Sequence, residues 1–294
     1  MHPHLHGYLS EILQSSVLLL GSVDTGKTTL ARFLWKQAKQ HALARAWLDL
    51  DPGQNFLGLP TTLSLCIQQI YASKWRRYFV GNTSPRGFML PMLTGAQRLL
   101  QYARKQHARF CLIDTCGFIT PEGGGRSFKN TLIELLRPQW ILALQREQEL
   151  EPILQCWEHH SHFRILRLPV TAEIQHKPPM FRRISRTAKL RAYFARATLL
   201  RFDLRHIDLF DYHPLETGRL IGLLDQDDFL LDLGIIQQTH LAHSLLEVWT
   251  PRRSTQDVCA IRTGRLKLNP HTGEELLPSS LLFANTLSHS PALR

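Results

Sequence analysis

The chain has 294 residues, of which 44% are hydrophobic and 20% are charged, a composition typical of a folded globular protein. No run approaches the ~18 apolar residues that a membrane-spanning helix needs, and the first residues do not read as a signal peptide. The five cysteines are scattered without a Cys-x-x-Cys pair, which argues against a disulfide framework or a zinc site and predicts a cytoplasmic location. The net charge of +11 favours a polyanionic partner.

A complete P-loop, Gly-Ser-Val-Asp-Thr-Gly-Lys-Thr, occupies residues 21–28. The apolar run at 16–20 predicts a buried strand before it, and residues 29–40 predict a helix after it. Lys27 is expected to reach the β- and γ-phosphates, and Thr28 is expected to ligate Mg²⁺. The expected nucleotide-binding residues are Gly21, Ser22, Val23, Asp24, Thr25, Gly26, Lys27, Thr28 and Thr29. The sequence therefore predicts a protein that binds a nucleoside triphosphate.

Apolar strands alternate with helical patterns over the first two-thirds of the chain, which predicts an α/β fold with a parallel sheet flanked by helices. Further strands are expected at 45–51, 77–80, 109–114, 139–144 and 163–168, and a helix at 93–106. Ligands of open parallel sheets bind beyond the carboxyl ends of the strands. The P-loop, Asp49, Asp51 and Asp114 all fall at such ends, so we expect them to converge on one site.

The hydrophobic pattern of the sequence changes near residue 199, where short apolar runs replace helical periodicity. These runs, at 220–224, 229–236, 246–250 and 257–262, predict a small, mostly β domain. The sequence therefore predicts a P-loop domain over 1–198 and a C-terminal domain over 199–294. Residues 123–125, three consecutive glycines, are expected to form a flexible loop rather than a second phosphate cradle.

Asp114 follows an apolar strand, as a Walker B carboxylate would, and is expected to hold Mg²⁺ opposite Thr28. The string Asp-x-x-Gly that it begins also occurs in GTPase switch regions. A GTPase usually carries an Asn-Lys-x-Asp motif, and this chain has none. An aspartate that merely ends a strand remains the alternative at this position.

Two carboxylates, Asp49 and Asp51, stand at positions i and i+2 of one strand and therefore point the same way. One carboxylate near the γ-phosphate could accept a proton from an attacking hydroxyl, while the other assists Mg²⁺. Gln54, after the Pro-Gly turn, could donate hydrogen bonds to a substrate phosphate. The alternatives are an ordinary charged turn, or the similar Asp-x-Asp-Pro string of P-loop ATPases that act as dimeric switches.

Basic residues dominate the stretch 177–205, which has nine of them and a single acidic residue, Asp203. A charge run of this kind is commonly the solvated face of a helix. In a chain that already binds phosphates, contact with the substrate becomes the stronger interpretation.

Five segments, in this order along the chain, resemble the polynucleotide 5′-hydroxyl kinase family. They are GSVDTGKTT (21–29), LDLDPGQ (48–54), FVGNTSP (79–85), IDTCGF (113–118) and FRRISRTAKLRAYF (181–194). The family includes the RNA kinase of mRNA 3′-end processing and tRNA splicing, the kinase of pre-ribosomal RNA processing, and smaller bacterial and archaeal members. Residues 220–276 are also similar to the short C-terminal domain of the prokaryotic members.

The resemblance implies a role for each matching residue. Asp51 matches the carboxylate that activates the 5′-hydroxyl, Asp49 supports it, and Asp114 matches the Walker B position. The implied substrate-binding residues are Gln54, Thr83, Ser84, Phe118, Lys177 and Arg186. Phe118 stands where relatives often have Trp, and Lys177 stands where they tend to have Arg, which can weaken the grip on substrate at both places.

The arginine-rich stretch matches the lid of the family, expected here over about 177–197. Arg182, supported by Arg183, is expected to stabilise the transferring phosphoryl group as an arginine finger does.

The resemblance thus implies a kinase that uses Mg²⁺ and ATP or GTP to phosphorylate the 5′-OH end of RNA or DNA. Two alternatives stay open: a P-loop switch whose hydrolysis controls partner binding, and a nucleic-acid-binding module with a vestigial nucleotide site. The sequence chooses neither between RNA and DNA nor between ATP and GTP.

Overall fold

The computed structural model describes residues 3–41, 44–69, 72–170, 174, 178–210 and 212–276. It divides into two compact units, residues 1–186 and 187–294. In the described ranges, every helix is too short or too polar to cross a membrane.

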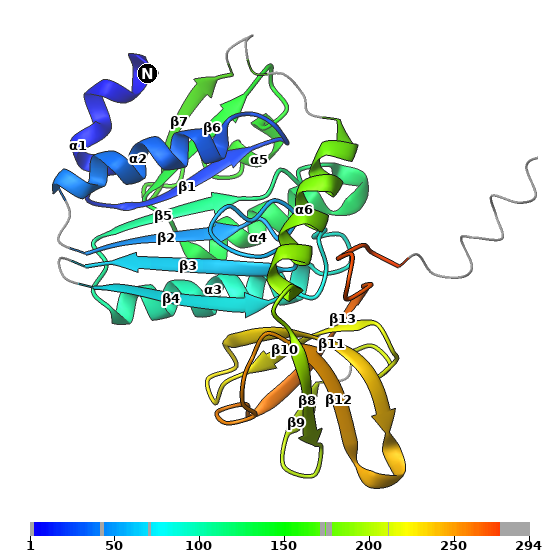
Figure 1. Ribbon diagram of the computed structural model, residues 1–294. Coiled ribbons are helices and arrows are strands. Elements are labelled where there is room, and N and C mark those ends of the chain that lie inside the picture. Colours follow the sequence, from blue (N-terminus) through cyan, green and yellow to red (C-terminus); the bar gives the residue numbers. More distant parts are fainter. Residues whose placement is uncertain are drawn as a thin grey trace, which may run out of the picture. The chain divides into compact units, whose positions relative to one another are not determined.

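The first unit alternates strands and helices (Figure 1). In chain order, its first elements are η1 (Pro3–Tyr8), α1 (Leu9–Ile12), β1 (Ser16–Gly21), α2 (Lys27–His41), β2 (Arg45–Leu50), β3 (Thr62–Gln68), β4 (Ser73–Phe79) and α3 (Met89–Lys105). They are followed by β5 (Phe110–Thr115), η2 (Pro121–Gly123), α4 (Gly125–Leu136), β6 (Trp140–Gln145), α5 (Glu151–Leu154) and β7 (Arg164–Pro169). The helix α6 (Pro179–Phe194) crosses the boundary between the two units.

The strands of this unit form a seven-stranded sheet in the order β4-β3-β2-β5-β1-β6-β7, counted over the described residues. The five strands from β2 to β7 in this order are parallel, and β3 and β4 add an antiparallel hairpin to one side. The register sets Leu19 beside Asp114, and Asp114 beside Asp49. The α/β fold with a parallel sheet is therefore confirmed, and the P-loop strand lies at its centre.

Three local predictions were incomplete or wrong. The expected strand at 77–80 is the end of a longer strand, β4, and its partner β3 was not predicted. β3 pairs with β4 through residues close in sequence, so the hairpin needs no separate helix between its strands. The glycines at 123–125 do not form a flexible loop: they end η2 and begin α4, with Gly124 in the left-handed region at φ 78°.

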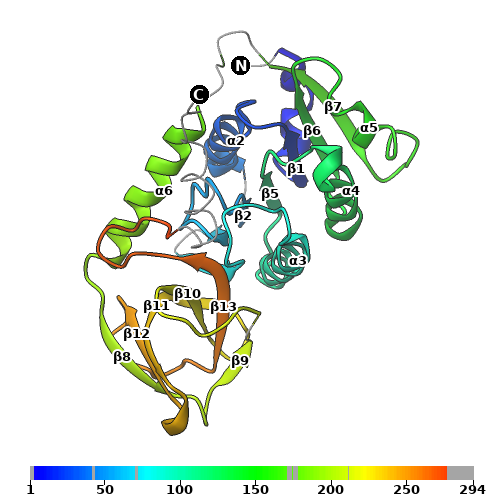
Figure 2. The ribbon, with the colours of Figure 1, turned by 90° about the vertical axis from the view of Figure 1, so that its right-hand side faces the viewer.

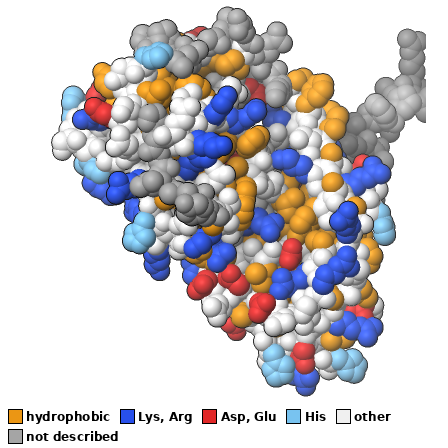
Figure 3. Space-filling model, turned by 60° about the vertical axis from the view of Figure 1, so that its left-hand side comes forward, with side chains coloured by type: hydrophobic (Ala, Val, Ile, Leu, Met, Phe, Trp, Pro, Cys, Tyr) orange, Lys and Arg blue, Asp and Glu red, His pale blue; other side chains and the backbone are white. Residues whose placement is uncertain are grey.

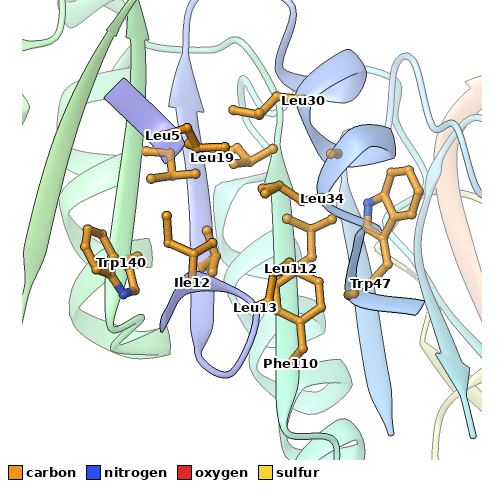
Figure 4. Close-up of a cluster of buried hydrophobic side chains, with 14 of the residues drawn as sticks. Leu5, Ile12, Leu13, Leu19, Leu30, Leu34, Trp47, Phe110, Leu112 and Trp140 are labelled. Carbon is orange, nitrogen blue, oxygen red and sulfur yellow. The ribbon is translucent and has the colours of Figure 1, made fainter. Parts of the chain in front are cut away.

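Apolar side chains on both faces of the central strands explain why the sheet is covered by helices on both sides. On one face, Leu30 and Leu34 of α2 pack with Leu19, Leu112 and other buried side chains of the sheet (Figure 4). The helices α3 and α4 pack against each other on the opposite face of the sheet (Figure 2). Because the carboxyl ends of the parallel strands stay uncovered by this packing, the loops that follow them are available for a site.

The second unit is mostly β, as expected. Its strands are β8 (Thr198–Asp203), β9 (Asp208–Phe210), β10 (Arg219–Leu224), β11 (Leu230–His240), β12 (Leu245–Thr250) and β13 (Ala260–Lys267), with η3 (Leu241–His243) between β11 and β12. Over the described residues they form a six-stranded sheet in the order β8-β12-β11-β10-β13-β9, which is antiparallel except where β13 meets β9. Its core includes Phe202, Ile221, Ile236 and Val248.

Candidate active site

The P-loop joins the end of β1 at Gly21 to the start of α2 at Lys27. Its turn depends on two glycines. A side chain at Gly21 would lie 2.6 Å from Oγ1 of Thr25, and Gly26 has a φ of 87°, which side chains rarely adopt. The loop therefore brings its backbone N–H groups to the N-terminus of a fifteen-residue helix, where anions bind favourably.

Lys27 is buried, and its ammonium lies inside the P-loop. Its Nζ donates a hydrogen bond to the carbonyl oxygen of Ser22 at 2.5 Å and lies 3.4 Å from Oγ1 of Thr25. Burial lowers the pKa of Lys27, while the nearby charge of Asp114 opposes that lowering. The side chain thus carries a weakly solvated cation at the point where a phosphate chain would enter the loop.

Thr28, in the first turn of α2, meets Asp114 near the carboxyl end of β5. The Thr28 hydroxyl donates a hydrogen bond to Oδ2 of Asp114 at 2.9 Å. Burial raises the pKa of Asp114 to about 6, although the charge of Lys27 and the Thr28 hydrogen bond oppose that rise. Two adjacent oxygens, one from a hydroxyl and one from a buried carboxylate, are ligands that Mg²⁺ accepts, so the donor set fits this ion.

Asp49 lies beside Asp114 in the register, but its oxygens have other partners. Oδ1 accepts the N–H of Asp51 at 3.1 Å, and Oδ2 accepts the N–H groups of Phe56 at 2.5 Å and Leu57 at 3.1 Å. These bonds make the buried Asp49 carboxylate the anchor of the segment that carries Asp51. The pair Thr28 and Asp114 fits the metal better than Asp49 does, because backbone N–H groups already occupy both Asp49 oxygens.

Asp51 is half-buried at the start of the turn after β2. Its Oδ1 accepts the N–H groups of Gly53 at 2.8 Å and Gln54 at 2.9 Å, which fixes the carboxylate group. Among the described residues, Oδ2 of Asp51 has no hydrogen-bond partner. The carboxylate is thus held in place by one oxygen, and the other can accept a proton.

The turn at Gly53 packs directly against the loop after β4. A side chain at Gly53 would lie 2.6 Å from the carbonyl oxygen of Thr83, so only glycine allows this approach. The loop keeps its own shape through Asn82, whose Oδ1 accepts the N–H of Thr83 at 3.0 Å. The loop that carries Thr83 and Ser84 therefore lies next to the turn that carries Gln54.

Phe118 lies at the end of the turn that follows Asp114. This turn presses on the P-loop, since a side chain at Gly117 would lie 2.5 Å from the backbone nitrogen of Val23. The Phe118 ring is half-buried and packs at a tilt against Phe128, with ring centroids 6.4 Å apart. A side chain at Gly123 would meet Cζ of Phe118 at 2.9 Å and Nη2 of Arg86 at 3.0 Å, so a cation lies near the ring.

The first turn of α6 contacts both the P-loop and the Asp51 turn. Arg182 donates from Nη1 to Oδ2 of Asp24 at 3.1 Å, and its carbonyl oxygen lies 3.4 Å from Nε2 of Gln54. Arg183 is exposed on the same helix, and Arg186 is half-buried one turn later. Lys177 lies outside the described residues. Among the described lid residues, Arg182 has a side chain that is joined to the P-loop by a hydrogen bond.

Sequence reasoning missed Arg146, which lies directly after β6. It donates from Nη2 to the carbonyl oxygen of Asp24 at 2.7 Å, and its Nη1 lies 3.4 Å from Oγ of Ser22. Its loop is held by Glu149, which accepts the backbone N–H of Arg146 at 3.0 Å. The available signal was a basic residue at the carboxyl end of a buried strand, in the position where the other strands carry their site residues.

Similarity to known proteins agrees with this geometry. A protein of Pyrococcus horikoshii named polyribonucleotide 5′-hydroxyl-kinase is 27% identical, over 89% of this chain and 88% of that protein. A protein of the same name from Methanocaldococcus jannaschii is 29% identical over 88% of each chain. The Xenopus laevis polyribonucleotide 5′-hydroxyl-kinase Clp1 is 26% identical over 79% of this chain and 57% of its own length.

The fold has a match among solved structures. The structure of a Clp1p–Pcf11p complex aligns with a TM-score of 0.66 at 15% identity, covering 90% of this chain and 78% of that one. Residues 21–196, more than half of the chain, match the family described as the mRNA cleavage and polyadenylation factor CLP1 P-loop. A P-loop kinase of this family takes its phosphate from a nucleotide donor. With the P-loop, the Walker B carboxylate and the loops beside them in place, the chain belongs to the CLP1 P-loop family.

Proposed function

We propose that the protein is a polynucleotide 5′-hydroxyl kinase, which transfers the γ-phosphate of ATP or GTP to the 5′-OH end of RNA or DNA. One observation carries the proposal: the Asp51 turn packs on the Thr83 loop, and only β5 separates β2 from the P-loop strand β1. The proposed base, the proposed substrate residues and the P-loop therefore lie at one edge of the sheet. The relatives named polyribonucleotide 5′-hydroxyl-kinase support it over most of the chain.

In the proposed reaction, the 5′-hydroxyl oxygen attacks the γ-phosphorus in line with the departing bridging oxygen. The proton of the hydroxyl goes to Asp51, and the electrons of the broken P–O bond stay on the nucleoside diphosphate. Because Gly53 and Gln54 hold Oδ1 of Asp51, its carboxylate is oriented before the substrate arrives.

Cations around the phosphates stabilise the charge that spreads over the transferring group. Lys27 supplies one from the P-loop, and Arg182 and Arg183 supply others from α6. Thr28 and Asp114 would hold Mg²⁺, which supplies further charge neutralisation when bound. Asp49 acts indirectly, because its oxygens accept hydrogen bonds from backbone N–H groups of the segment that carries Asp51.

The polynucleotide is gripped near its 5′ end. Gln54, Thr83, Ser84 and Arg186 are the proposed phosphate and ribose contacts, and Phe118 is the proposed stacking surface for a terminal base. Lys177 is proposed as a further contact. Figure 3 shows Lys and Arg side chains over much of one face, with acidic side chains among them. The net charge of +11 suits a polyanion.

The proposal assigns the reaction to residues 1–198, with the lid over about 177–197, and leaves 199–294 as a separate domain. It is tested by transfer of ³²P from the γ-position of ATP, and separately of GTP, to 5′-OH RNA and DNA strands in the presence of Mg²⁺. Label on a strand with the wild type, and none with Lys27→Ala, supports the kinase and ranks donors and acceptors together. Hydrolysis of the triphosphate without label on any strand would favour the alternative, a P-loop switch.

Strand binding provides a second test. Each phosphate of a single strand that the protein neutralises contributes about −0.7 to the slope of log K against log salt concentration. An affinity for the strand that does not change with salt concentration would contradict the proposed contact between the basic segment and the strand.

A further inference from the structure

Lys129 is a fully buried lysine on α4. The buried face of this helix is formed by Phe128, Leu132, Ile133 and Leu136, and Lys129 lies on the same face with no exposed surface. The spacing of these neighbours calls for an apolar side chain at position 129. Removing a cation from water costs free energy, so the presence of a lysine at this buried position needs an explanation.

The ammonium of Lys129 is aimed at the turn that follows Asp114. Its Nζ donates a hydrogen bond to the carbonyl oxygen of Cys116 at 2.6 Å and lies 3.7 Å from the Cys116 sulfur. Within the described ranges, no carboxylate forms an ion pair with Lys129. The protein therefore keeps a buried positive charge whose main partner is a backbone carbonyl.

The residues on either side of Cys116, from Asp114 to Gly117, contact the P-loop side of the site. Asp114 accepts the Thr28 hydroxyl, Oγ1 of Thr115 donates to the carbonyl oxygen of Leu19 at 2.7 Å, and Gly117 abuts Val23. Cys116, in the middle, is held from the opposite side by Lys129. The lysine thus completes the set of contacts that determines where Asp114 and Phe118 lie.

We propose that Lys129 is a positioning residue, which holds the Cys116 carbonyl so that Asp114 stays against Thr28 in the geometry that binds Mg²⁺ with the nucleotide. This inference rests on the proposed function for its link to turnover. It predicts that loss of Lys129 raises the Mg²⁺ requirement of the protein rather than unfolding it.

The test compares Lys129→Met, which has similar length but neither charge nor donor, with Lys129→Gln, which keeps a donor. Lys105→Met, at the exposed end of α3, is the matched control. Two quantities are measured: the Mg²⁺ concentration for half-maximal binding of a fluorescent ATP analogue, and the same quantity for strand phosphorylation. Melting temperatures are recorded in EDTA.

We expect the Mg²⁺ midpoint of Lys129→Met to rise about tenfold, as for loss of one hydrogen bond from a charged donor. Lys129→Gln should lie between Lys129→Met and the wild type, and Lys105→Met should match the wild type. An unchanged midpoint in Lys129→Met overturns the inference. If Lys129→Met does not fold, a wild-type midpoint in Lys129→Gln with a lowered melting temperature overturns it in favour of a purely structural role.

The two proposals fail in different ways. A wild type that binds the ATP analogue with Mg²⁺ but labels no strand contradicts the kinase function. The Mg²⁺ midpoint for nucleotide binding still decides the role of Lys129 in that case. A wild type that labels strands, together with variants whose midpoints do not move, contradicts only the role of Lys129.

Discussion

Arg182 donates a hydrogen bond to Asp24 at 3.1 Å, and this contact joins the first turn of α6 to the P-loop. Asp24 adopts the left-handed region at φ 56°, so the loop presents its carboxylate in a conformation that few residues other than glycine, asparagine and aspartate accept. The guanidinium is therefore held beside the phosphate-binding loop, within reach of a negative charge that develops there.

Replacement of Arg182 tests its proposed contact with the transferring phosphoryl group. We expect Arg182→Ala to lower kcat by about 10²–10³-fold, the usual effect of losing one preorganised donor to the transition state. Arg182→Lys should recover part of the loss, because it keeps the charge but not the planar fork. Single-turnover rates and nucleotide Kd values separate the effect on chemistry from the effect on binding. Wild-type turnover in Arg182→Ala would remove the residue from the mechanism.

Asp51→Asn tests the proposed general base. Asparagine keeps one oxygen for the N–H groups of Gly53 and Gln54, so the turn and the nucleotide affinity should be retained. It cannot accept the proton of the 5′-hydroxyl, so kcat should fall by about 10²–10⁴-fold. The measurement is strand phosphorylation at saturating ATP, with nucleotide binding measured on the same preparation. Full activity of this variant would exclude Asp51 as the base.

Arg146→Met tests the contact that sequence reasoning missed. The variant loses the hydrogen bond to the Asp24 carbonyl oxygen, so the P-loop should be less well ordered for its ligand. We expect the Kd for ATP to rise about fivefold, as for a typical hydrogen bond, with kcat at saturating ATP close to that of the wild type. Arg253→Met, at an exposed arginine of the second unit, is the control. An unchanged Kd, or a loss confined to kcat, would contradict this role.

The buried carboxylate of Asp114 makes stability depend on pH when metal is absent. Burial raises the pKa of Asp114 to about 6 from an ordinary value of 3.8. Between these values the folded chain binds more protons than the unfolded chain, so this contribution to stability is present at low pH and is lost as the pH rises through about 6. Each unit of pKa difference corresponds to about 1.4 kcal/mol.

Urea unfolding in EDTA at a series of pH values from about 4 to about 7, which spans the window between the two pKa values, measures this loss. Asp114→Asn cannot titrate at this position, so its free energy of unfolding should fall less than that of the wild type as the pH rises toward about 6. Burial and the charge of Asp114 both raise the pKa of Asp49, so Asp114→Asn also removes part of that rise, and the difference between the two pH profiles reports the coupled pair of carboxylates. Parallel pH profiles for the two proteins would contradict the raised pKa.

Local sequence predicted much of the fold. The strands β1, β2, β5 and β6 are runs of mainly apolar residues, and such runs form buried parallel strands wherever helices can cover them. The strand β7, at the edge of the sheet, was also predicted. The strand β3 was not predicted, because its pairing with β4 depends on the partner strand. The helix α4 was missed because the three glycines before it predict a loop, and burial of its apolar face outweighs that preference.

Residues of the candidate site could be predicted where a sequence motif specifies their chemical role. Lys27, Thr28 and Asp114 lie at strand and helix ends that the P-loop pattern defines, and Thr28 and Asp114 are within hydrogen-bond distance as the pattern requires. The arginine-rich segment was predicted as a lid, and the structure forms it as the helix α6, which begins three residues before Arg182. The roles of Arg183, Arg186 and Lys177 stay predictions.

The sequence by itself determined the nucleotide site, because a P-loop is local: its glycines, lysine and threonine act within one turn between a strand and a helix. Only the tertiary structure decided what surrounds that site. Arg146 reaches Asp24 across 122 residues, and Gln54 reaches the carbonyl oxygen of Arg182 across 128. No periodicity or spacing records such contacts, because they depend on which strands become neighbours in the sheet. The packing of the sheet and helices also decided two hydrogen-bond partners. The Asp49 carboxylate accepts backbone N–H groups of the loop that carries Asp51, and Lys129 donates to the carbonyl oxygen of Cys116.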